Sequence, residues 1–425
     1  MSAATLTKAI GFKLPTASSH PSRLVARHCS ICITKPLSRS TKSIASSPFV
    51  NIMNIAPSST SSLSSDDAQL AADAEKYIQM DRHNDKGIIT LNRPKALNAL
   101  NYHMANRLEA GLKVWDNDSQ IKMVVIRSAS EKAFCAGGDV KAISASGPAG
   151  GKKFFRQEYA LNNLIGSLSV PYVALLDGIV MGGGCGLSVH GNFRVVTEKA
   201  LFAMPETAIG LFPDVGASNF LNKLPGSLGL YFGLTGQRML GRDLFKAGIG
   251  THFVPSDKLA NLQEELLRIE KPDLLKIDRI LRKHQEQWED EYRKEFSLKP
   301  NIGRINSIFG KANTVEEIIS GLEKDNSEWA RKHLETLAKM SPTSLKLTFE
   351  QLKRGKTMTL PECLKMEYRM ACRVLDNTEF YEGVRAVLVD KDNKPKWNPS
   401  KLDEVTEAQI NAYFEPLARH EELQL

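Results

Sequence analysis

Hydrophobic residues in the first half of the chain gather in short uninterrupted runs, and longer segments with helical spacing lie between them. Four runs have the length and composition of buried strands: 88–91, 123–126, 172–176 and 193–196. Two of the intervening segments are expected to be helical: 101–115 and 152–168. This alternation predicts an α/β sheet domain with crossover helices.

The pattern changes after about residue 256. Strand signals become rare, and charged, amphipathic, helix-forming segments follow at 257–294, 313–355 and 360–375. Pro361 stands near the start of the last segment, where proline suits a first helical turn. We therefore expect a core at 75–256 followed by a mostly helical region at 257–425.

The first 65 residues differ in composition from the rest. They are rich in Ser and Thr and contain seven Lys or Arg but no Asp or Glu, which is typical of an organellar transit peptide ending in a flexible linker. A mitochondrial (matrix) destination is favoured over a chloroplast, and a disordered basic tail for anionic partners is the alternative.

Once this segment is set aside, the formal net charge falls from +8 to +1. The remaining chain thus has no basic footprint for a nucleic acid. No stretch approaches the roughly 18 consecutive apolar residues that cross a bilayer, so membrane insertion is not expected.

The cysteines give little reason to expect a metal or redox site. Cys29 and Cys32 form a C-x-x-C within the first 65 residues, without a second pair that would complete a metal-ligand set. The other four are dispersed and are interpreted as reduced, small apolar residues: Cys135, Cys185, Cys363 and Cys372.

Two glycine-rich turns, 134–139 and 178–186, each follow a buried strand. Glycine allows close approach of the backbone, so two such turns could direct one N–H each at a single developing oxyanion. The structural alternative is a tight turn or a packing contact, and for one glycine run that is the usual outcome. Neither run fits a P-loop or a dinucleotide-binding fingerprint.

A third segment, 204–216, carries two carboxylates in an otherwise apolar stretch rich in proline and glycine. Pro205 suits a first helical position and places Glu206 in a first turn, where negative charge is favoured. Asp214 could equally be a turn residue after Pro213. The functional interpretation is a pair of acid–base or nucleophilic carboxylates, and the segment alone does not decide between these.

The three segments in this order are AFCAGGD, PYVALLDGIVMGGGCGLSVHGNFRV and FAMPETAIGLFPDVG, and together they resemble the crotonase (enoyl-CoA hydratase/isomerase) superfamily. The similarity runs from about Tyr77 to about Phe414 and includes the C-terminal SPTSLK and MEYR segments. It implies an α/β fold, a crotonase-like spiral of ββα units followed by a helical C-terminal region. It also implies an acyl-CoA substrate, whose coenzyme A needs no separate cofactor or metal.

The resemblance assigns expected roles residue by residue. Gly138 and Gly183 match the two oxyanion-hole amides, and Glu206 matches the catalytic glutamate. Asp214 matches a second catalytic carboxylate of the hydrolases in this superfamily. Glu158 matches a residue that contacts the acyl part, and Gly183, Glu206 and Asp214 are also expected to contact the substrate.

One departure from the superfamily pattern bears on the reaction. Hydratases have a glutamate two residues after the last glycine of GGG, and this chain has Gly186 there. The pair that adds water to a double bond is therefore incomplete, which favours thioester hydrolysis. The resemblance itself implies the substrate, 3-hydroxyisobutyryl-CoA or a related short 3-hydroxyacyl-CoA, in valine breakdown. An enoyl-CoA hydratase or isomerase and a non-catalytic crotonase-like binding protein are the alternatives.

Three further expectations come from the resemblance. The adenine and phosphates of CoA should pass near residues 93–98 and the first glycine turn. Residues 217–219 (Ala-Ser-Asn) depart from the family pattern, which could alter acyl specificity. The fold often trimerises, so a homo-oligomer is an open possibility.

Overall fold

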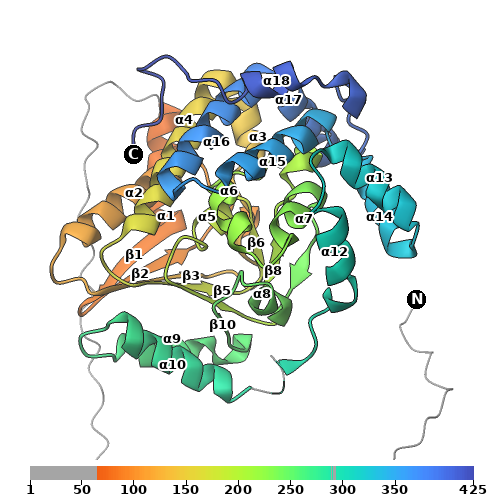
Figure 1. Ribbon diagram of the computed structural model, residues 1–425. Coiled ribbons are helices and arrows are strands. Elements are labelled where there is room, and N and C mark those ends of the chain that lie inside the picture. Colours follow the sequence, from red (N-terminus) through yellow and green to blue (C-terminus); the bar gives the residue numbers. More distant parts are fainter. Residues whose placement is uncertain (1–64, 289, 291–292) are drawn as a thin grey trace, which may run out of the picture. The chain divides into compact units, whose positions relative to one another are not determined.

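The computed structural model describes residues 65–425 except 289 and 291–292 (Figure 1). The proposed transit peptide, with Cys29 and Cys32, lies outside the described residues. The first helix, α1 (Ser65–Tyr77), begins before residue 75, where the sequence analysis placed the start of the core. Ala74 of this helix is buried, and α1 packs against the helix at 102–117.

Six strands form the larger sheet, in the order β1–β2–β3–β5–β7–β10. Their bounds are β1 (Ile78–His83), β2 (Lys86–Leu91), β3 (Met123–Ser128), β5 (Tyr172–Leu176), β7 (Phe193–Val196) and β10 (His252–Phe253). β1 pairs with β2 in antiparallel fashion and every other neighbouring pair is parallel. All four strands expected from the sequence lie in this sheet.

Four short strands form a second sheet, in the order β4–β6–β8–β9. Their bounds are β4 (Ala133–Cys135), β6 (Ile179–Met181), β8 (Leu201–Ala203) and β9 (Met239–Leu240). The first three are parallel to one another. Successive strands alternate between the sheets, β3 to β4, β5 to β6 and β7 to β8, so each turn of the chain adds one strand to each sheet. This confirms the expected ββα spiral.

Helices follow the strands of the spiral. The core holds η1 (Pro94–Ala96), α2 (Tyr102–Asn117), α3 (Val140–Ala145), α4 (Gly147–Ser167), α5 (Gly183–Gly186), η2 (Glu206–Ile209), α6 (Ala217–Phe220), η3 (Leu221–Lys223), α7 (Leu228–Thr235) and α8 (Arg242–Lys246). The Asn101 side chain caps α2 by accepting from the Met104 N–H at 2.9 Å. The helices expected at 101–115 and 152–168 are confirmed.

The remaining helices come from the C-terminal region, which is mostly helical as expected. They are η4 (Ser256–Lys258), α9 (Leu259–Leu267), α10 (Leu274–Glu286), η5 (Lys299–Asn301), α12 (Ile302–Ile308), α13 (Val315–Asp325), α14 (Glu328–Leu337), α15 (Pro342–Gly355), α16 (Leu360–Asp376), α17 (Glu379–Val384), a π-helical turn (Arg385–Val389), η7 (Leu402–Glu404) and α18 (Glu407–Ala412). Thr359 and Glu362 form a capping box at the start of α16.

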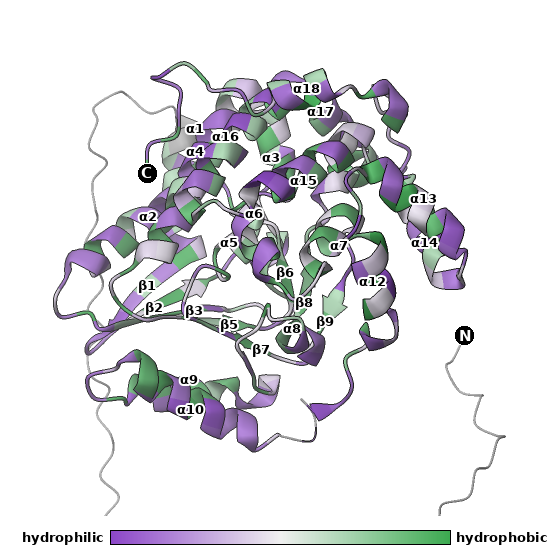
Figure 2. Cartoon of the chain, in the orientation of Figure 1, coloured by the Kyte–Doolittle hydropathy of each residue, from purple (hydrophilic) through white to green (hydrophobic). Residues whose placement is uncertain are grey.

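Both faces of the larger sheet are covered, which explains why its strands are continuous apolar runs rather than alternating ones. α9 and α10 lie beneath one face (Figure 1), where Leu262, Leu266 and Ile277 pack against sheet residues such as Val125 and Val173. The opposite face borders the main core. Figure 2 shows the strands as mostly hydrophobic and α10 as largely hydrophilic on its outer side.

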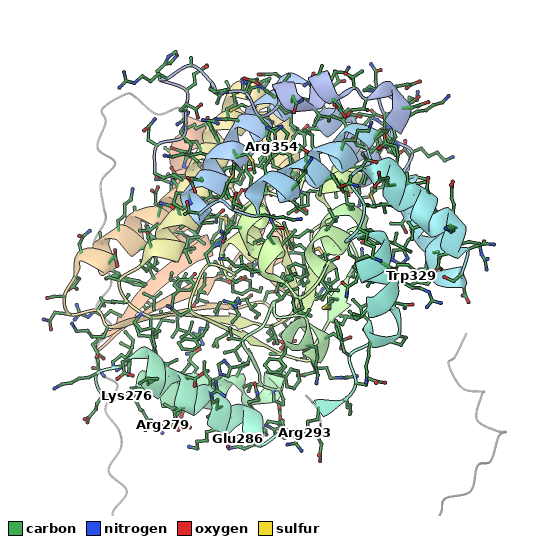
Figure 3. All side chains as sticks on the ribbon, viewed as in Figure 1. Lys276, Arg279, Glu286, Arg293, Trp329 and Arg354 are labelled. Atoms are coloured by element: carbon green, nitrogen blue, oxygen red, sulfur yellow. The ribbon has the colours of Figure 1, made fainter. Side chains whose placement is uncertain are left out.

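The charged face of α10 points away from the sheet. Figure 3 shows Lys276, Arg279 and Glu286 projecting outward from this helix. The C-terminal helices on the other side pack directly onto the core, with α16 against α4 and α15 against α6 and α7. The described residues form one compact unit. The change near residue 256 therefore lies within this unit, at the point where the described strands end and the C-terminal helices begin.

Candidate active site

The three sequence motifs follow three neighbouring parallel strands of the smaller sheet. The first glycine turn follows β4, the second follows β6, and the Met-Pro-Glu segment follows β8. Because the carboxyl ends of parallel strands meet at one edge of a sheet, motifs far apart in the sequence converge there. The topology therefore brings Gly138, Gly183 and Glu206 together.

The amides of Gly138 and Gly183 lie next to each other. Leu100 pairs with Gly138 in a parallel bridge: the Leu100 N–H donates to Gly137 O at 2.8 Å, and Leu100 O accepts from Asp139 N at 2.7 Å. The Gly138 N–H, which lies between these two bonds, is therefore directed away from Leu100. Gly183 begins α5, so its N–H has no acceptor within the helix. A Cβ placed on Gly183 would lie 3.3 Å from Gly138 N.

The two adjacent glycine turns require glycine at several positions. Gly137 has φ +105° and Gly182 has φ +44°, which are conformations that other residues rarely adopt. A Cβ on Gly183 would also collide with Glu158 Oε1. The requirement for glycine thus comes from the close approach of the two turns to each other and to a carboxylate.

Glu206 begins η2 and faces the second glycine turn. Its Oε1 lies 3.0 Å from the position that a Cβ on Gly182 would occupy. The side chain is buried, and Oε2 has no hydrogen-bond partner among the described residues. A buried carboxylate oxygen without a partner is rare in proteins and points to a ligand or to a catalytic role.

Asp214 and Glu158 complete a cluster of buried carboxyl groups. Asp214 Oδ2 accepts a hydrogen bond from the Tyr159 hydroxyl at 2.8 Å. Glu158 precedes Tyr159 on α4, and its Oε1 has no partner among the described side chains. The structure therefore brings all five site residues expected from the sequence to one place.

The three carboxyl groups of the cluster have no Lys or Arg ion-pair partner among the residues that the structure describes. Burial raises the pKa of Glu158 and of Glu206 well above the usual range, and the nearby Asp214 charge raises both further. Burial also raises the pKa of Asp214, and the hydrogen bond from Tyr159 opposes this rise. Such mutual perturbation of acidic groups is characteristic of sites that transfer protons.

The cysteines near the cluster are not nucleophiles. Burial raises the pKa of Cys135 to about 12 and that of Cys185 well above its usual value, so both remain thiols. Cys363 and Cys372 are also free and buried, as the sequence suggested. Between residues 65 and 425, outside the gaps, no group of His, Cys, Asp and Glu has the arrangement of a metal site.

The loop expected near the CoA phosphates lies beside the first glycine turn. Arg93 Nη1 forms an ion pair with Asp139 at 2.9 Å and donates to Ala99 O at 2.8 Å. Asn98 is fully buried and its amide donates to Ala133 O and Phe134 O, each at 3.0 Å. These contacts fix residues 93–98 against β4.

Sequence reasoning missed two residues that shape the site. Tyr159 is adjacent to Glu158 in sequence, but nothing in the pattern indicated that its hydroxyl reaches Asp214. Glu367, in the MEYR segment of α16, accepts hydrogen bonds from Gly216 N at 2.7 Å and Ser218 N at 2.9 Å. Both contacts join segments far apart in the chain, so only the fold reveals them.

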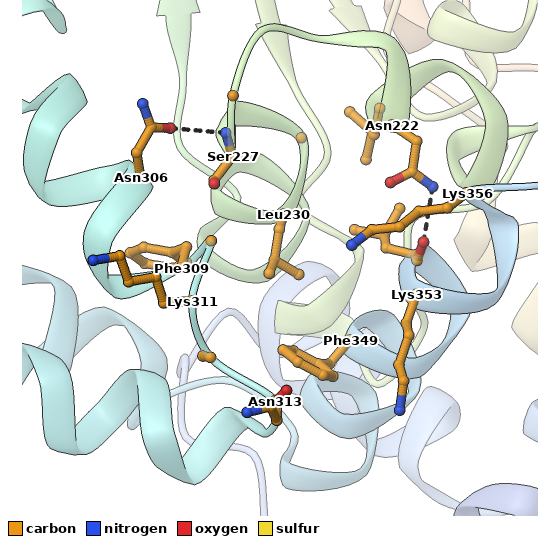
Figure 4. A pocket seen from close by; sticks show the side chains of 16 residues that line it. Asn222, Ser227, Leu230, Asn306, Phe309, Lys311, Asn313, Phe349, Lys353 and Lys356 are labelled. Carbon is orange, nitrogen blue, oxygen red and sulfur yellow. Dashed lines mark hydrogen bonds between the residues drawn. The ribbon is translucent and has the colours of Figure 1, made fainter.

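A separate cavity of about 610 Å³ lies between α7, α12 and α15 (Figure 4). Its lining includes Lys311, Lys353 and Lys356 together with apolar residues such as Phe309 and Phe349. None of the carboxyl groups of the cluster lines this cavity. No helix in the part of the chain that the structure describes is long and apolar enough to cross a membrane.

Comparison with known proteins identifies close relatives. The chain is 53% identical over 334 residues to a Xenopus laevis protein named 3-hydroxyisobutyryl-CoA hydrolase, mitochondrial, covering 78% of this chain and 86% of that protein. It is 51% identical over 348 residues to the human protein of the same name, covering 81% and 90% respectively. These names confirm the predicted mitochondrial location.

Two solved structures share the fold at lower identity. A carnitinyl-CoA dehydratase from Mycobacterium thermoresistibile is 36% identical, with a TM-score of 0.75 over 82% of this chain and 98% of that chain. An enoyl-CoA hydratase from Rhodobacter sphaeroides is 34% identical, with a TM-score of 0.73 over 82% of this chain and 100% of the other. The family model described as enoyl-CoA hydratase/isomerase matches residues 86–414. The chain therefore belongs to the enoyl-CoA hydratase/isomerase family.

Proposed function

We propose that this chain hydrolyses 3-hydroxyisobutyryl-CoA. Water cleaves the thioester: a C–O bond forms at the acyl carbon, the C–S bond breaks, and the products are 3-hydroxyisobutyrate and coenzyme A. The chain is an acyl-CoA thioester hydrolase, like the relatives that match most of its length. The reaction would serve valine breakdown in the mitochondrion.

The observation that carries this proposal is the position of Glu206 beside the two glycine turns. The N–H groups of Gly138 and Gly183 are adjacent, and Glu206 lies against the turn that contains Gly182. A thioester carbonyl oxygen that accepts from both amides gains stabilisation as negative charge develops on it. One such donor contributes roughly 3–4 kcal/mol in other acyl-transfer enzymes.

Glu206 supplies the attack on the acyl carbon by one of two routes. Its carboxylate attacks directly and forms an enzyme-bound anhydride that water then hydrolyses, or it removes a proton from the attacking water. The unpartnered Oε2 supports either route, because the oxygen is buried yet not committed to another group in the described part of the protein.

Asp214 and Glu158 have different roles in this scheme. Asp214, held by Tyr159, orients water or transfers its proton. Glu158 uses its unpartnered Oε1 to accept a hydrogen bond from the 3-hydroxyl of the acyl group. A plain acyl chain would leave this buried oxygen unsatisfied, which favours hydroxyacyl substrates.

No other cofactor is needed, since the substrate carries the coenzyme A. The CoA adenine and phosphates are expected near residues 93–98 and the first glycine turn, which the Arg93–Asp139 ion pair holds together. Homo-oligomer formation stays a prediction of the family fold.

Release of free thiol by the full chain tests the proposal. The purified protein is given 3-hydroxyisobutyryl-CoA and, in parallel, a panel of short acyl-CoA and 3-hydroxyacyl-CoA esters. We expect the highest kcat/KM for 3-hydroxyisobutyryl-CoA. Equal values across the panel would refute the proposed role of the hydroxyl, and no thiol release from any ester would refute hydrolysis.

Single-turnover hydrolysis in oxygen-18 water separates the two routes for Glu206. Direct attack puts label into the Glu206 carboxylate, because water then opens the anhydride at either carbonyl. Water activation leaves the enzyme unlabelled and puts all the label into the product acid.

A hydratase is the second candidate, because two solved structures with a similar fold are named as a dehydratase and a hydratase. The structure around Gly186 argues against it. A Cβ there would lie 2.6 Å from Asn162 Nδ2 and 2.9 Å from Val215 Cβ, so no second glutamate fits without rearrangement. Hydration of crotonyl-CoA faster than thioester cleavage would establish this alternative.

A further inference from the structure

The turn that follows Asp214 has an unusual backbone. Val215 is β-branched, fully buried and has φ +53°, and Gly216 follows with φ +82°. A positive φ is strained for a β-branched residue, and such conformations persist only where surrounding contacts hold them. The position of the Asp214 side chain therefore depends on whatever holds this turn.

Glu367 holds the turn from a distant part of the sequence. It lies on α16, about 150 residues after Asp214, and is fully buried. Its Oε2 accepts from Gly216 N at 2.7 Å and its Oε1 accepts from Ser218 N at 2.9 Å. The two N–H groups, two residues apart in a turn, form a concave anion-binding arrangement that one carboxylate fills.

The other side chains that contact this turn bind its carbonyl oxygens. They do not bind the N–H groups of Gly216 and Ser218. Gln351 Nε2 donates to Pro213 O, and the His190 ring contacts Val215 O at 2.7 Å through Nε2. Within the described part of the chain, only Glu367 binds the N–H groups of both Gly216 and Ser218.

A buried carboxylate is a costly way to hold a turn. Burial raises the pKa of Glu367 to about 8, and no Lys or Arg pairs with it in the described structure. An apolar side chain of similar size would avoid this desolvation but would leave the buried Gly216 and Ser218 N–H groups without acceptors. What the carboxylate adds is two acceptors at fixed positions.

We propose that Glu367 is a positioning residue for the hydrolysis: its two oxygens fix the strained turn and thereby keep the Asp214 carboxylate against Tyr159 and beside Glu206. This inference rests on the proposed function. Glu367 acts through Asp214 and does not itself contact the reacting atoms.

Glu367→Gln is the informative change because it keeps the size of the side chain. The glutamine amide has one acceptor oxygen, so its NH₂ group must face either the Gly216 or the Ser218 N–H. The turn then loses one hydrogen bond and gains a donor–donor contact. Asp243→Asn is the matched control, since Asp243 on α8 is another buried carboxylate that accepts a backbone N–H, that of Ser297 at 3.3 Å.

A double-mutant cycle on the full chain tests the inference through thiol release. Glu367→Gln alone should lower kcat by about tenfold or more while KM stays within about twofold, because misplacing a catalytic group affects the reaction more than binding. In the Asp214→Asn background the same change should lower kcat by less than about twofold. Asp243→Asn should leave kcat unchanged in both backgrounds.

Equal fold-losses in the two backgrounds, or a kcat for Glu367→Gln equal to wild type, would overturn the proposal. Amide hydrogen exchange gives a second readout that needs no activity. Exchange in a peptide spanning the turn should accelerate in Glu367→Gln and in the shorter Glu367→Asp, and unchanged exchange in both would also overturn it. A wild-type chain that released no thiol would refute the proposed function, while the exchange data would still decide whether Glu367 holds the turn.

Discussion

The Tyr159 hydroxyl donates to Asp214 Oδ2 at 2.8 Å and so joins α4 to the turn that follows Glu206. Glu158 is the preceding residue on α4. This helix therefore carries the Glu158 carboxyl group and, through Tyr159, also binds the Asp214 carboxyl group. This hydrogen bond favours the ionised form of Asp214 and opposes the rise in its pKa that burial causes.

Tyr159→Phe should move the acid limb of the pH–kcat profile to higher pH. The change removes the hydrogen bond that lowers the pKa of Asp214, so the carboxyl group will remain protonated to a higher pH. We expect a shift of up to about one pH unit, measured from thiol release between about pH 5 and 9, a range that spans the operating pH of most acid–base catalysts.

Tyr172→Phe is the control for that shift. Tyr172 is buried as well, but its hydroxyl donates to Leu187 O at 3.0 Å rather than to a carboxylate. Its profile should keep the wild-type acid limb. A Tyr159→Phe profile that coincides with wild type, or that moves to lower pH, would contradict the assigned effect on Asp214.

Glu158→Gln should stabilise the protein at alkaline pH. Burial first, and then the charges of Asp214 and Glu206, raise the pKa of Glu158 above its ordinary value of 4.5. A raised carboxyl pKa means that the folded state binds the proton more tightly than the unfolded state does. The resulting stabilisation is complete below pH 4.5 and is lost as the pH rises through the raised value.

Glutamine carries no charge at any pH, so the variant avoids that loss. At about pH 8 its free energy of unfolding should exceed that of wild type by roughly 1–3 kcal/mol, and the difference should shrink toward acid pH. Urea unfolding at several pH values measures this difference. A variant that is less stable than wild type throughout, by an amount that does not change with pH, would contradict the prediction.

The same variant should lose selectivity for hydroxyacyl substrates. If Glu158 accepts a hydrogen bond from the 3-hydroxyl, Glu158→Gln should lower kcat/KM for 3-hydroxyisobutyryl-CoA about tenfold more than for isobutyryl-CoA. Comparison of the two esters cancels effects on the thioester itself. An equal loss for both would assign Glu158 a role unrelated to the hydroxyl.

Gly186→Ala should destabilise the fold by about 1–3 kcal/mol, because the added Cβ meets two buried neighbours. It would lie 2.6 Å from Asn162 Nδ2 and 2.9 Å from Val215 Cβ. Gly303→Ala is the matched control: Gly303 lies within α12, and no heavy atom lies within 4 Å of the position that its added methyl group would occupy. That change should stabilise by up to about 1 kcal/mol through helix propensity, and urea denaturation of both variants checks the contrast.

The sequence predicted the parts of the fold whose patterns are local. The run Tyr172–Leu176 is continuous and apolar, and it forms β5. β1 (Ile78–His83) was missed because Asp81, Arg82 and His83 interrupt its apolar pattern, although the backbone pairs along its whole length with β2. β4, β6 and β8 have three residues each, which is too short for periodicity to register.

The same distinction between local and non-local features applies to the active site. The glycine turns and Glu206 are recognisable because each motif is contiguous in sequence, and their convergence follows from the order of three neighbouring strands. The contacts of Tyr159 and Glu367 with the Asp214 turn depend on how α4 and α16 pack against it. No local pattern encodes a contact between residues about 150 positions apart, so these required the structure.

The most direct test of the account is the rate of thiol release from 3-hydroxyisobutyryl-CoA by the full chain and by its Glu206→Gln variant, with near-UV circular dichroism to confirm that both are folded. The account predicts rapid release by the wild type and a loss of roughly a hundredfold to ten-thousandfold in kcat when the Glu206 carboxylate becomes an amide. A folded Glu206→Gln variant that releases coenzyme A as fast as the wild type would contradict it.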